Sequence, residues 1–156
     1  MTHHDGSRVV LTCGVAGSGK TTFAKQLETT GYVRLSVDDE VRKRIESGVL
    51  SRDADARLVS ISIEEDIRAR LIDLVRHGRD VVVDFSFWKR SARDAYRRLV
   101  EANGGQVELV YFRSDPAAGD TIARDAASLD RYIPEFEVPG EDERPIVIEG
   151  YSGGMQ

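Results

Sequence analysis

The segment GVAGSGKT, residues 14–21, combines three glycines with a lysine and a threonine at a spacing that suits a phosphate chain. It matches the pattern G-x-x-x-x-G-K-[ST] in full, and it lies between a strand-like run and a helix-like run. Glycines allow the backbone to wrap so closely that successive N–H groups point at phosphate oxygens. The lysine brings charge to the β and γ phosphates, and the threonine hydroxyl is a Mg²⁺ ligand. We therefore expect a nucleotide-binding loop.

The loop predicts a set of nucleotide contacts and half of a metal site. The residues expected to bind the nucleotide are Gly14, Ala16, Gly17, Ser18, Gly19, Lys20, Thr21 and Thr22. An acidic residue at the end of a neighbouring apolar strand commonly completes the Mg²⁺ site, and Asp84 in VVVDF has that position. The alternative for Asp84 is a helix cap beyond a strand end. The next residue is Phe85 where many ATPases have a water-activating Glu, which disfavours hydrolysis as the main reaction.

The segment LSVDDEVR, residues 35–42, supplies residues suited to an acceptor site. A carboxylate there can accept the proton of a hydroxyl that attacks the γ-phosphate. Asp38 follows the predicted strand most directly and is the favoured base, with Asp39 as the alternative. Both carboxylates also suit a helix N-terminus, where the dipole stabilises negative charge. Arg42, one turn further on, is suited to a bidentate clamp on an anionic acceptor or a phosphate.

These residues must be positioned by alternating strands and helices. Apolar and β-branched runs predict strands at 8–13, 32–37, 80–85, 106–112 and 145–150. Helical spacing predicts helices at 20–31, 38–48, 57–77 and 91–105. Strands that alternate with helices imply βαβ units, and hence a parallel sheet with helices on both faces. We expect one α/β domain over residues 1–156.

Composition narrows the class of protein. The chain has 40% hydrophobic and 31% charged residues, no apolar run near the roughly 20 residues that cross a bilayer, and no secretory signal in MTHHDGSR. We therefore expect a cytoplasmic protein that does not bind membranes. The net charge of −5 disfavours broad attachment to nucleic acid. The single cysteine, Cys13, lies in an apolar strand-like run and is expected to be a small buried hydrophobe.

Four stretches carry a family resemblance in this order: GVAGSGKTTFAKQL, RLSVDDEVRKR, GRDVVVDFSFWKRSARDAYRRL and FEVPGEDE. With them the chain resembles the P-loop kinases of the nucleoside, shikimate and gluconate kinase group. It looks most similar to the branch with polynucleotide-kinase-like and antibiotic-phosphotransferase-like proteins. The first stretch is highly specific for the superfamily, whereas the other three are looser and indicate the branch.

The resemblance implies a three-layer P-loop NTPase fold with a five-stranded parallel sheet of order 2-3-1-4-5. It also implies ATP as the donor, Mg²⁺ as the cofactor, Asp38 as the base and Asp84 near the metal. Arg93 is expected to reach toward the acceptor, or else to belong to a solvated helix stripe with Arg90 and Arg97. Phe87 and Trp88 are expected either to stack on a flat acceptor or to pack in the core. FEVPGEDE is a candidate adenine loop.

The expected lid departs from the family pattern. Such kinases carry a helical lid with paired arginines after the fourth strand, but the region at about 113–135 is short and contains Gly119. Arg124 lies where a lid arginine is expected, with Arg113 and Arg131 as fallbacks. An arginine that stabilises the transferring group contributes several orders of magnitude in rate. The alternative for Arg124 is an exposed helix residue.

Taken together, these features predict an ATP-dependent phosphotransferase that acts on a hydroxyl of a small molecule. One alternative is an ATP-binding regulatory or partner protein with a degenerate lid and no efficient transfer. A second alternative is a nucleic-acid 5′-hydroxyl kinase, which a basic line of Arg42, Arg90, Arg93 and Arg97 would favour. The sequence specifies neither the acceptor nor the oligomeric state.

Overall fold

The computed structural model describes residues 6–15, 18–51, 53, 56–113 and 136–149. The strands in this part of the chain are β1 (Arg8–Gly14), β2 (Val33–Leu35), β3 (Val81–Val83), β4 (Gln106–Arg113) and β5 (Ile146–Glu149). The helices are α1 (Lys20–Thr29), α2 (Val37–Glu46), α3 (Ala56–Arg76) and α4 (Arg90–Ala102), with the short 3₁₀ turn η2 (Glu141–Glu143) before β5. These elements follow the alternation that the sequence predicts.

The five strands form one parallel sheet in the order β2-β3-β1-β4-β5, which confirms the predicted topology. The central strand β1 pairs with β3 on one side and with β4 on the other. The strands β2 and β5 form the two edges of the sheet. Because every strand runs in the same direction, all five carboxyl ends meet at one edge, where ligands bind in open α/β sheets.

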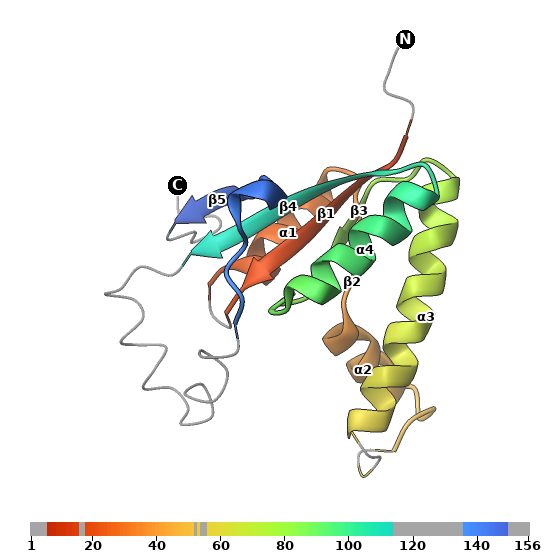
Figure 1. The fold of residues 1–156 in the computed structure, drawn as a ribbon. Coiled ribbons are helices and arrows are strands. Elements are labelled where there is room, and N and C mark those ends of the chain that lie inside the picture. The colour runs from red at the N-terminus through yellow and green to blue at the C-terminus, as the bar shows by residue number, and fades with distance from the viewer. Residues whose placement is uncertain (1–5, 16–17, 52, 54–55, 114–135, 150–156) are drawn as a thin grey trace.

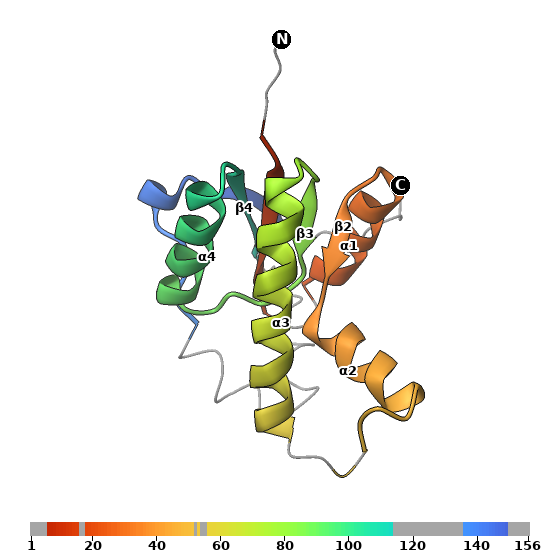
Figure 2. The same ribbon diagram turned by 90° about the vertical axis from the view of Figure 1, so that its right-hand side faces the viewer.

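Helices cover both faces of the sheet (Figures 1 and 2). Alternate strand residues point to opposite faces, so Val9 and Leu11 pack beneath α3 and α4, whereas Val10 packs beneath α1. On α3, Ile63, Ile67 and Leu71 are fully buried against the first face, and Leu74 is partly buried. The result is the expected three-layer architecture.

The second strand is shorter than the sequence predicts. It ends at Leu35, because the Ser36 hydroxyl accepts a hydrogen bond from the Asp39 N–H at 3.3 Å and caps α2. The expectation of a strand up to Val37 is therefore wrong, and Val37 begins the helix instead. As a consequence Asp38 and Asp39 lie in the first turn of α2, at the carboxyl edge of the sheet.

Figures 1 and 2 show α2 and the N-terminal part of α3 beyond the carboxyl ends of the strands. Ion pairs join the two helices: Arg44 lies 3.0 Å from Asp66, and Arg70 lies 3.4 Å from Glu40. The ion pairs therefore hold α2 against α3 at this end of the sheet. Within the part of the chain that the structure describes, no helix is both long enough and apolar enough to cross a membrane.

Candidate active site

The phosphate loop begins where β1 ends. A Cβ at Gly14 would lie 2.9 Å from the Phe112 carbonyl oxygen, so no larger residue fits there without a shift. Gly19 precedes α1 in a left-handed conformation, φ 102°, which glycine adopts without strain. These two glycines shape the start and the end of the loop. Ala16 and Gly17, which the sequence also assigns to the loop, lie outside the described residues.

The far end of the loop presents donors suited to an anion. The Ser18 hydroxyl oxygen is buried and has no hydrogen-bond partner within the described ranges. No side chain caps the N-terminus of α1, so the first backbone N–H groups of the helix, from Lys20 to Thr22, remain available. An orphaned buried hydroxyl beside an uncapped helix N-terminus matches what a bound phosphate requires.

Lys20 is folded back into the loop. Its side chain is buried, and its ammonium donates a hydrogen bond to the Val15 carbonyl at 2.9 Å. Burial lowers the pKa of Lys20, and the nearby Asp84 carboxylate opposes this effect. The ammonium therefore lies inside the loop, where a β or γ phosphate would replace the carbonyl as its partner.

Thr21 and Asp84 come together as the sequence predicts. The Thr21 hydroxyl oxygen lies 3.4 Å from Asp84 Oδ1, and the Asp84 side chain is only 4% exposed. The backbone of Asp84 is fixed by a hydrogen bond from its N–H to the Leu35 carbonyl at 2.8 Å. A hydroxyl and one carboxylate are the hard oxygen donors that Mg²⁺ takes from proteins, with phosphate and water as its other ligands. These two residues therefore fit the implied cofactor.

A larger all-protein metal cage is not formed by the described part of the chain, where no group of three or more His, Cys, Asp and Glu side chains converges.

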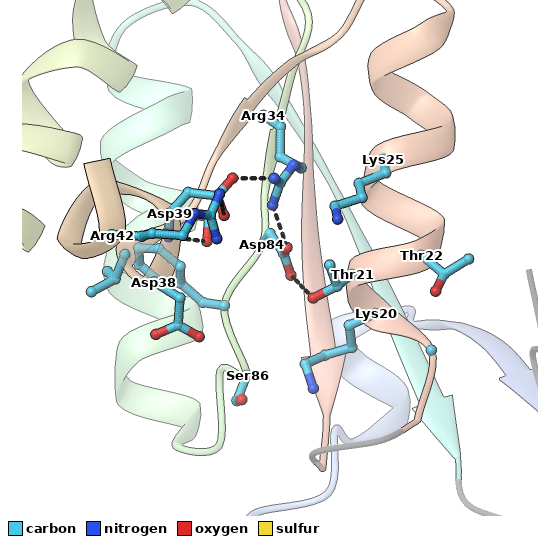
Figure 3. Close-up of a pocket in the computed structure, with 14 residues that line it drawn as sticks. Lys20, Thr21, Thr22, Lys25, Arg34, Asp38, Asp39, Arg42, Asp84 and Ser86 are labelled. Carbon is cyan, nitrogen blue, oxygen red and sulfur yellow. Dashed lines mark hydrogen bonds and ion pairs between the residues drawn. The ribbon is translucent and has the colours of Figure 1, made fainter. Parts of the chain in front are cut away.

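The two neighbouring aspartates have different environments. Asp39 is held by Arg34 in an ion pair, and its other oxygen lies 3.1 Å from Arg42. The Asp38 carboxylate forms no ion pair or hydrogen bond with another residue of the described ranges. In Figure 3 it points toward the side of the cleft where Lys20 and Ser86 lie, away from Arg34. Asp38 is thus the aspartate that is free to accept a proton.

These side chains line one cleft at the carboxyl edge of the sheet, with a volume of about 790 Å³ (Figure 3). Its lining includes Gly19, Lys20, Thr21, Thr22, Lys25, Arg34, Ser36, Val37, Asp38, Asp39, Arg42, Asp84, Phe85 and Ser86. The cleft therefore brings together the loop end, the predicted metal residues, both candidate bases and Arg42.

Sequence reasoning missed two cations of this cleft, Arg34 and Lys25. Arg34 lies on β2, and its guanidinium contacts both Asp39 and Asp84. A lone arginine within the apolar alternation YVRLSV was the available signal, since a charge that a strand buries needs a partner. Lys25 lies one turn after Thr21 on α1, at a spacing that places the two residues on the same helix face.

Both sequence interpretations of Arg93 are wrong. Arg93 is 2% exposed, and its Nε donates to Glu143 at 2.7 Å. Its NH1 donates to the carbonyls of Phe87 and Trp88 at 2.8 and 3.2 Å. Arg93 therefore neither reaches an acceptor nor belongs to a solvated stripe. Its donors are directed at buried partners, and the main one, Glu143, lies 50 positions later in the sequence.

Phe87 packs in the core, 5% exposed, where its ring stacks on Phe85. Of its two interpretations, core packing is therefore the one that the structure supports. Cys13 is also fully buried, as expected, and burial raises the pKa of its thiol to about 11.

The predicted lid at 113–135 lies outside the described residues except for Arg113. Arg124 and the fallback Arg131 belong to this part, so their predicted roles stay predictions. The side chain of Arg113 pairs with Glu149 of the neighbouring strand β5.

Residues 9–125 match a family model described as an AAA domain, which covers more than half of the chain. A stretch of 79 residues is 37% identical to the UPF0200 protein PAE1629 of Pyrobaculum aerophilum, over 49% of this chain and 44% of that protein. The chain thus matches less than half the length of this curated relative.

Solved structures show the same fold at low sequence identity. A sugar kinase from Janibacter sp. HTCC2649 aligns over 92% of this chain and 85% of its own, with a TM-score of 0.58 and 19% identity. The APS kinase CysC of Mycobacterium tuberculosis, solved with AMPPNP and APS, covers 92% of this chain and 88% of its own, with a TM-score of 0.59 and 17% identity. The chain belongs to the AAA domain family, and it shares its fold with these kinase structures.

Proposed function

We propose that this protein is an ATP-dependent phosphotransferase that moves the γ-phosphate of ATP to a hydroxyl group of a small molecule. The observation that carries the proposal is the free carboxylate of Asp38 in the cleft that also holds Lys20, Thr21 and Asp84. Its neighbour Asp39 is occupied by two arginines. One unpaired carboxylate beside a phosphate-binding loop is what a transfer to an alcohol requires.

The donor side uses the loop and the start of α1. Lys20 and the backbone N–H groups at the start of the helix hold the β and γ phosphates. Thr21 and Asp84 would hold Mg²⁺ through the hydroxyl and Oδ1, which lie 3.4 Å apart. When bound, Mg²⁺ neutralises charge on the β and γ phosphates.

The transfer step uses Asp38 as a general base. The acceptor hydroxyl loses its proton to the Asp38 carboxylate while its oxygen forms a bond to the γ-phosphorus. The bond between that phosphorus and the β–γ bridging oxygen breaks, and ADP leaves with its electron pair. Arg42 is 59% exposed and pairs with Asp39 through one nitrogen, so its guanidinium retains donors for an anionic acceptor or for the transferring group. We propose Arg124 as the lid arginine that stabilises this group.

A small-molecule acceptor is favoured over a nucleic-acid end. The basic line that would favour a nucleic acid is broken, because Arg93 is buried on Glu143. Arg90 pairs with Asp142, and Arg97 lies 3.8 Å from Glu101. The net charge of −5 points the same way.

The proposal is tested by transfer of labelled γ-phosphate from ATP to a panel of nucleosides, sugars, antibiotics and 5′-hydroxyl oligonucleotides. With the best acceptor, Asp38→Asn is expected to lower kcat about 10²- to 10⁴-fold, the range that a general base contributes. Asp39→Asn is expected to cost far less, because its carboxylate already pairs with arginines.

Two lysine variants serve as a matched pair. Lys20→Ala is expected to abolish ATP binding, whereas Lys43→Ala, an exposed lysine of α2, is expected to bind ATP as the wild type does. ATP binding without transfer to any acceptor would favour the regulatory alternative. Full activity of Asp38→Asn together with loss in Asp39→Asn would reassign the base.

A further inference from the structure

Arg34 connects two carboxylates that belong to different elements. Its side chain on β2 is 7% exposed. One terminal nitrogen donates to Asp84 Oδ2 at 2.9 Å, and the other pairs with Asp39 on α2 (Figure 3). A planar guanidinium can serve two carboxylates at once, which the single ammonium of a lysine does less well.

The two oxygens of Asp84 have separate partners. Oδ2 is held by Arg34, and Oδ1 lies 3.4 Å from the Thr21 hydroxyl. Because Arg34 takes one oxygen, it fixes the rotation of the carboxylate and leaves the other oxygen directed at Thr21. The guanidinium lies on the opposite oxygen from the predicted metal position, so metal binding does not require Arg34 to leave.

The positive charge of Arg34 also lies between two negative side chains. Asp84 is 4% exposed and Asp39 is 21% exposed, so without Arg34 two poorly solvated carboxylates would repel each other at this corner of the cleft. This repulsion would displace Asp84 from its position beside Thr21.

The geometry points to Arg34 as a positioning residue that presents Asp84 to Mg²⁺ beside Thr21 and, through Asp39, fixes the first turn of α2 that carries Asp38. This inference rests on the proposed function, because it concerns the metal and the base of the same site. The Arg34 guanidinium thereby links the donor side of the cleft, at Asp84 after β3, to the acceptor side, at α2.

The test is the effect of Mg²⁺ on the affinity for ADP, measured by calorimetry with Mg²⁺ and with EDTA. In Arg34→Met, the tightening that Mg²⁺ gives to ADP binding is expected to shrink about 10- to 100-fold, as for other groups that orient a metal ligand. The affinity in EDTA depends on Lys20 and the loop and is expected to change less than about threefold. Arg8→Met, an exposed strand arginine at the other end of the sheet, is the matched control and is expected to behave as the wild type.

The outcomes separate this inference from the proposed function. If ADP binding by the wild type does not depend on Mg²⁺, both are wrong. If Mg²⁺ tightens ADP binding equally in the wild type and in Arg34→Met, the inference alone is wrong. The same holds if Arg34→Met loses ADP affinity equally with Mg²⁺ and with EDTA. If circular dichroism shows that Arg34→Met does not fold, Arg34→Lys replaces it, and the ratio of the ADP affinities with Mg²⁺ and with EDTA is measured again. In Arg34→Lys this ratio is expected to fall less than in Arg34→Met, but measurably.

A second variant tests the charge argument. In the Arg34→Met background, Asp39→Asn removes the carboxylate that would repel Asp84. It is therefore expected to restore about threefold or more of the Mg²⁺ effect. No restoration would overturn the charge argument.

Discussion

Arg34 and Arg93 are both buried and both bind carboxylates, but they do so in different surroundings. Arg93 and Glu143 form a sealed pair, with side chains 2% and 3% exposed and two donor–acceptor contacts at 2.7 and 3.2 Å. The terminal nitrogens of Arg34 instead bind two carboxylates that line the cleft, Asp84 and Asp39, and its Nε lies 3.5 Å from Glu28 of α1.

The two arginines differ in how many hydrogen-bonding atoms around them are left for a ligand. Arg93 also donates to two backbone carbonyls, and Glu143 also accepts the Gly140 N–H at 3.0 Å, so this network has little capacity left for a ligand. It fastens the segment that leads into β5 to the start of α4. Around Arg34, by contrast, Asp84 keeps one oxygen toward Thr21. Burial of an arginine therefore does not by itself indicate a functional site. A carboxylate oxygen beside it that no cation of the protein holds does indicate one.

The largest expected effect on stability comes from breaking the sealed pair of Arg93 and Glu143. Arg93→Met leaves the Glu143 carboxylate buried without its partner and is expected to lower the free energy of unfolding by about 3–5 kcal/mol. The measurement is urea denaturation followed by circular dichroism. The Mg²⁺ effect on ADP affinity is expected to persist in the folded fraction, because Arg93 does not line the cleft.

Two variants control this result. Arg97→Met, on the same helix and more exposed, is expected to cost less than about 1 kcal/mol. The double variant Arg93→Met, Glu143→Leu removes both charges and is expected to recover most of the loss. A loss below about 1 kcal/mol in Arg93→Met would show that the pair does not hold this region.

A smaller effect concerns pH. Burial by itself would raise the pKa of Glu143, but hydrogen bonds from Arg93 and the Gly140 N–H bring it below the ordinary value of 4.5. Because the folded pKa is the lower one, ionised Glu143 stabilises the fold above the unfolded pKa, and this stabilisation is lost as the pH falls through the folded pKa.

Denaturation at a series of pH values tests this sign. The difference in unfolding free energy between wild type and Glu143→Gln is expected to be largest above about pH 5 and to shrink as the pH falls below about 4. A difference that stays constant over this range would contradict the ionised state of Glu143.

The smallest effect is expected at the surface beside the sealed pair. Arg90 pairs with Asp142, and both side chains are exposed. Surface ion pairs contribute little to stability because water and salt screen them. Arg90→Met is therefore expected to leave the denaturation midpoint unchanged within error, in low and in high salt. Arg90 also lies 3.8 Å from Glu143, and a clear loss would show that this longer contact contributes to the stability of the sealed pair.

Much of the fold was predictable, because each strand and helix carries its own periodicity. The apolar run at β1 and the helical spacing at α3 are local patterns, and both elements were predicted correctly. The end of β2 was missed because the alternation of YVRLSV continues past Leu35, whereas the chain follows the cap at Ser36. A hydroxyl that bonds a backbone N–H three residues later overrides a weak strand preference.

In the candidate site too, local motifs were predicted and contacts between distant residues were not. The phosphate loop and the meeting of Thr21 with Asp84 follow from the motif and from parallel strands, and the structure brings these residues together. The roles of Arg34 and Arg93 were missed or misassigned because their partners lie far away in the sequence. Arg34 meets Asp84 50 positions later, and Arg93 meets Glu143 50 positions later.

By itself the sequence determined that this chain has a loop for a phosphate chain, an acidic residue beside it and two aspartates near its acceptor side. These features depend on consecutive residues whose chemistry does not change with their surroundings. Only the tertiary structure decided that Asp39 is occupied and Asp38 is free, and that Arg93 is sealed in the interior. A charged side chain acquires its role from the opposite charges that the fold places around it, and those come from other strands and helices.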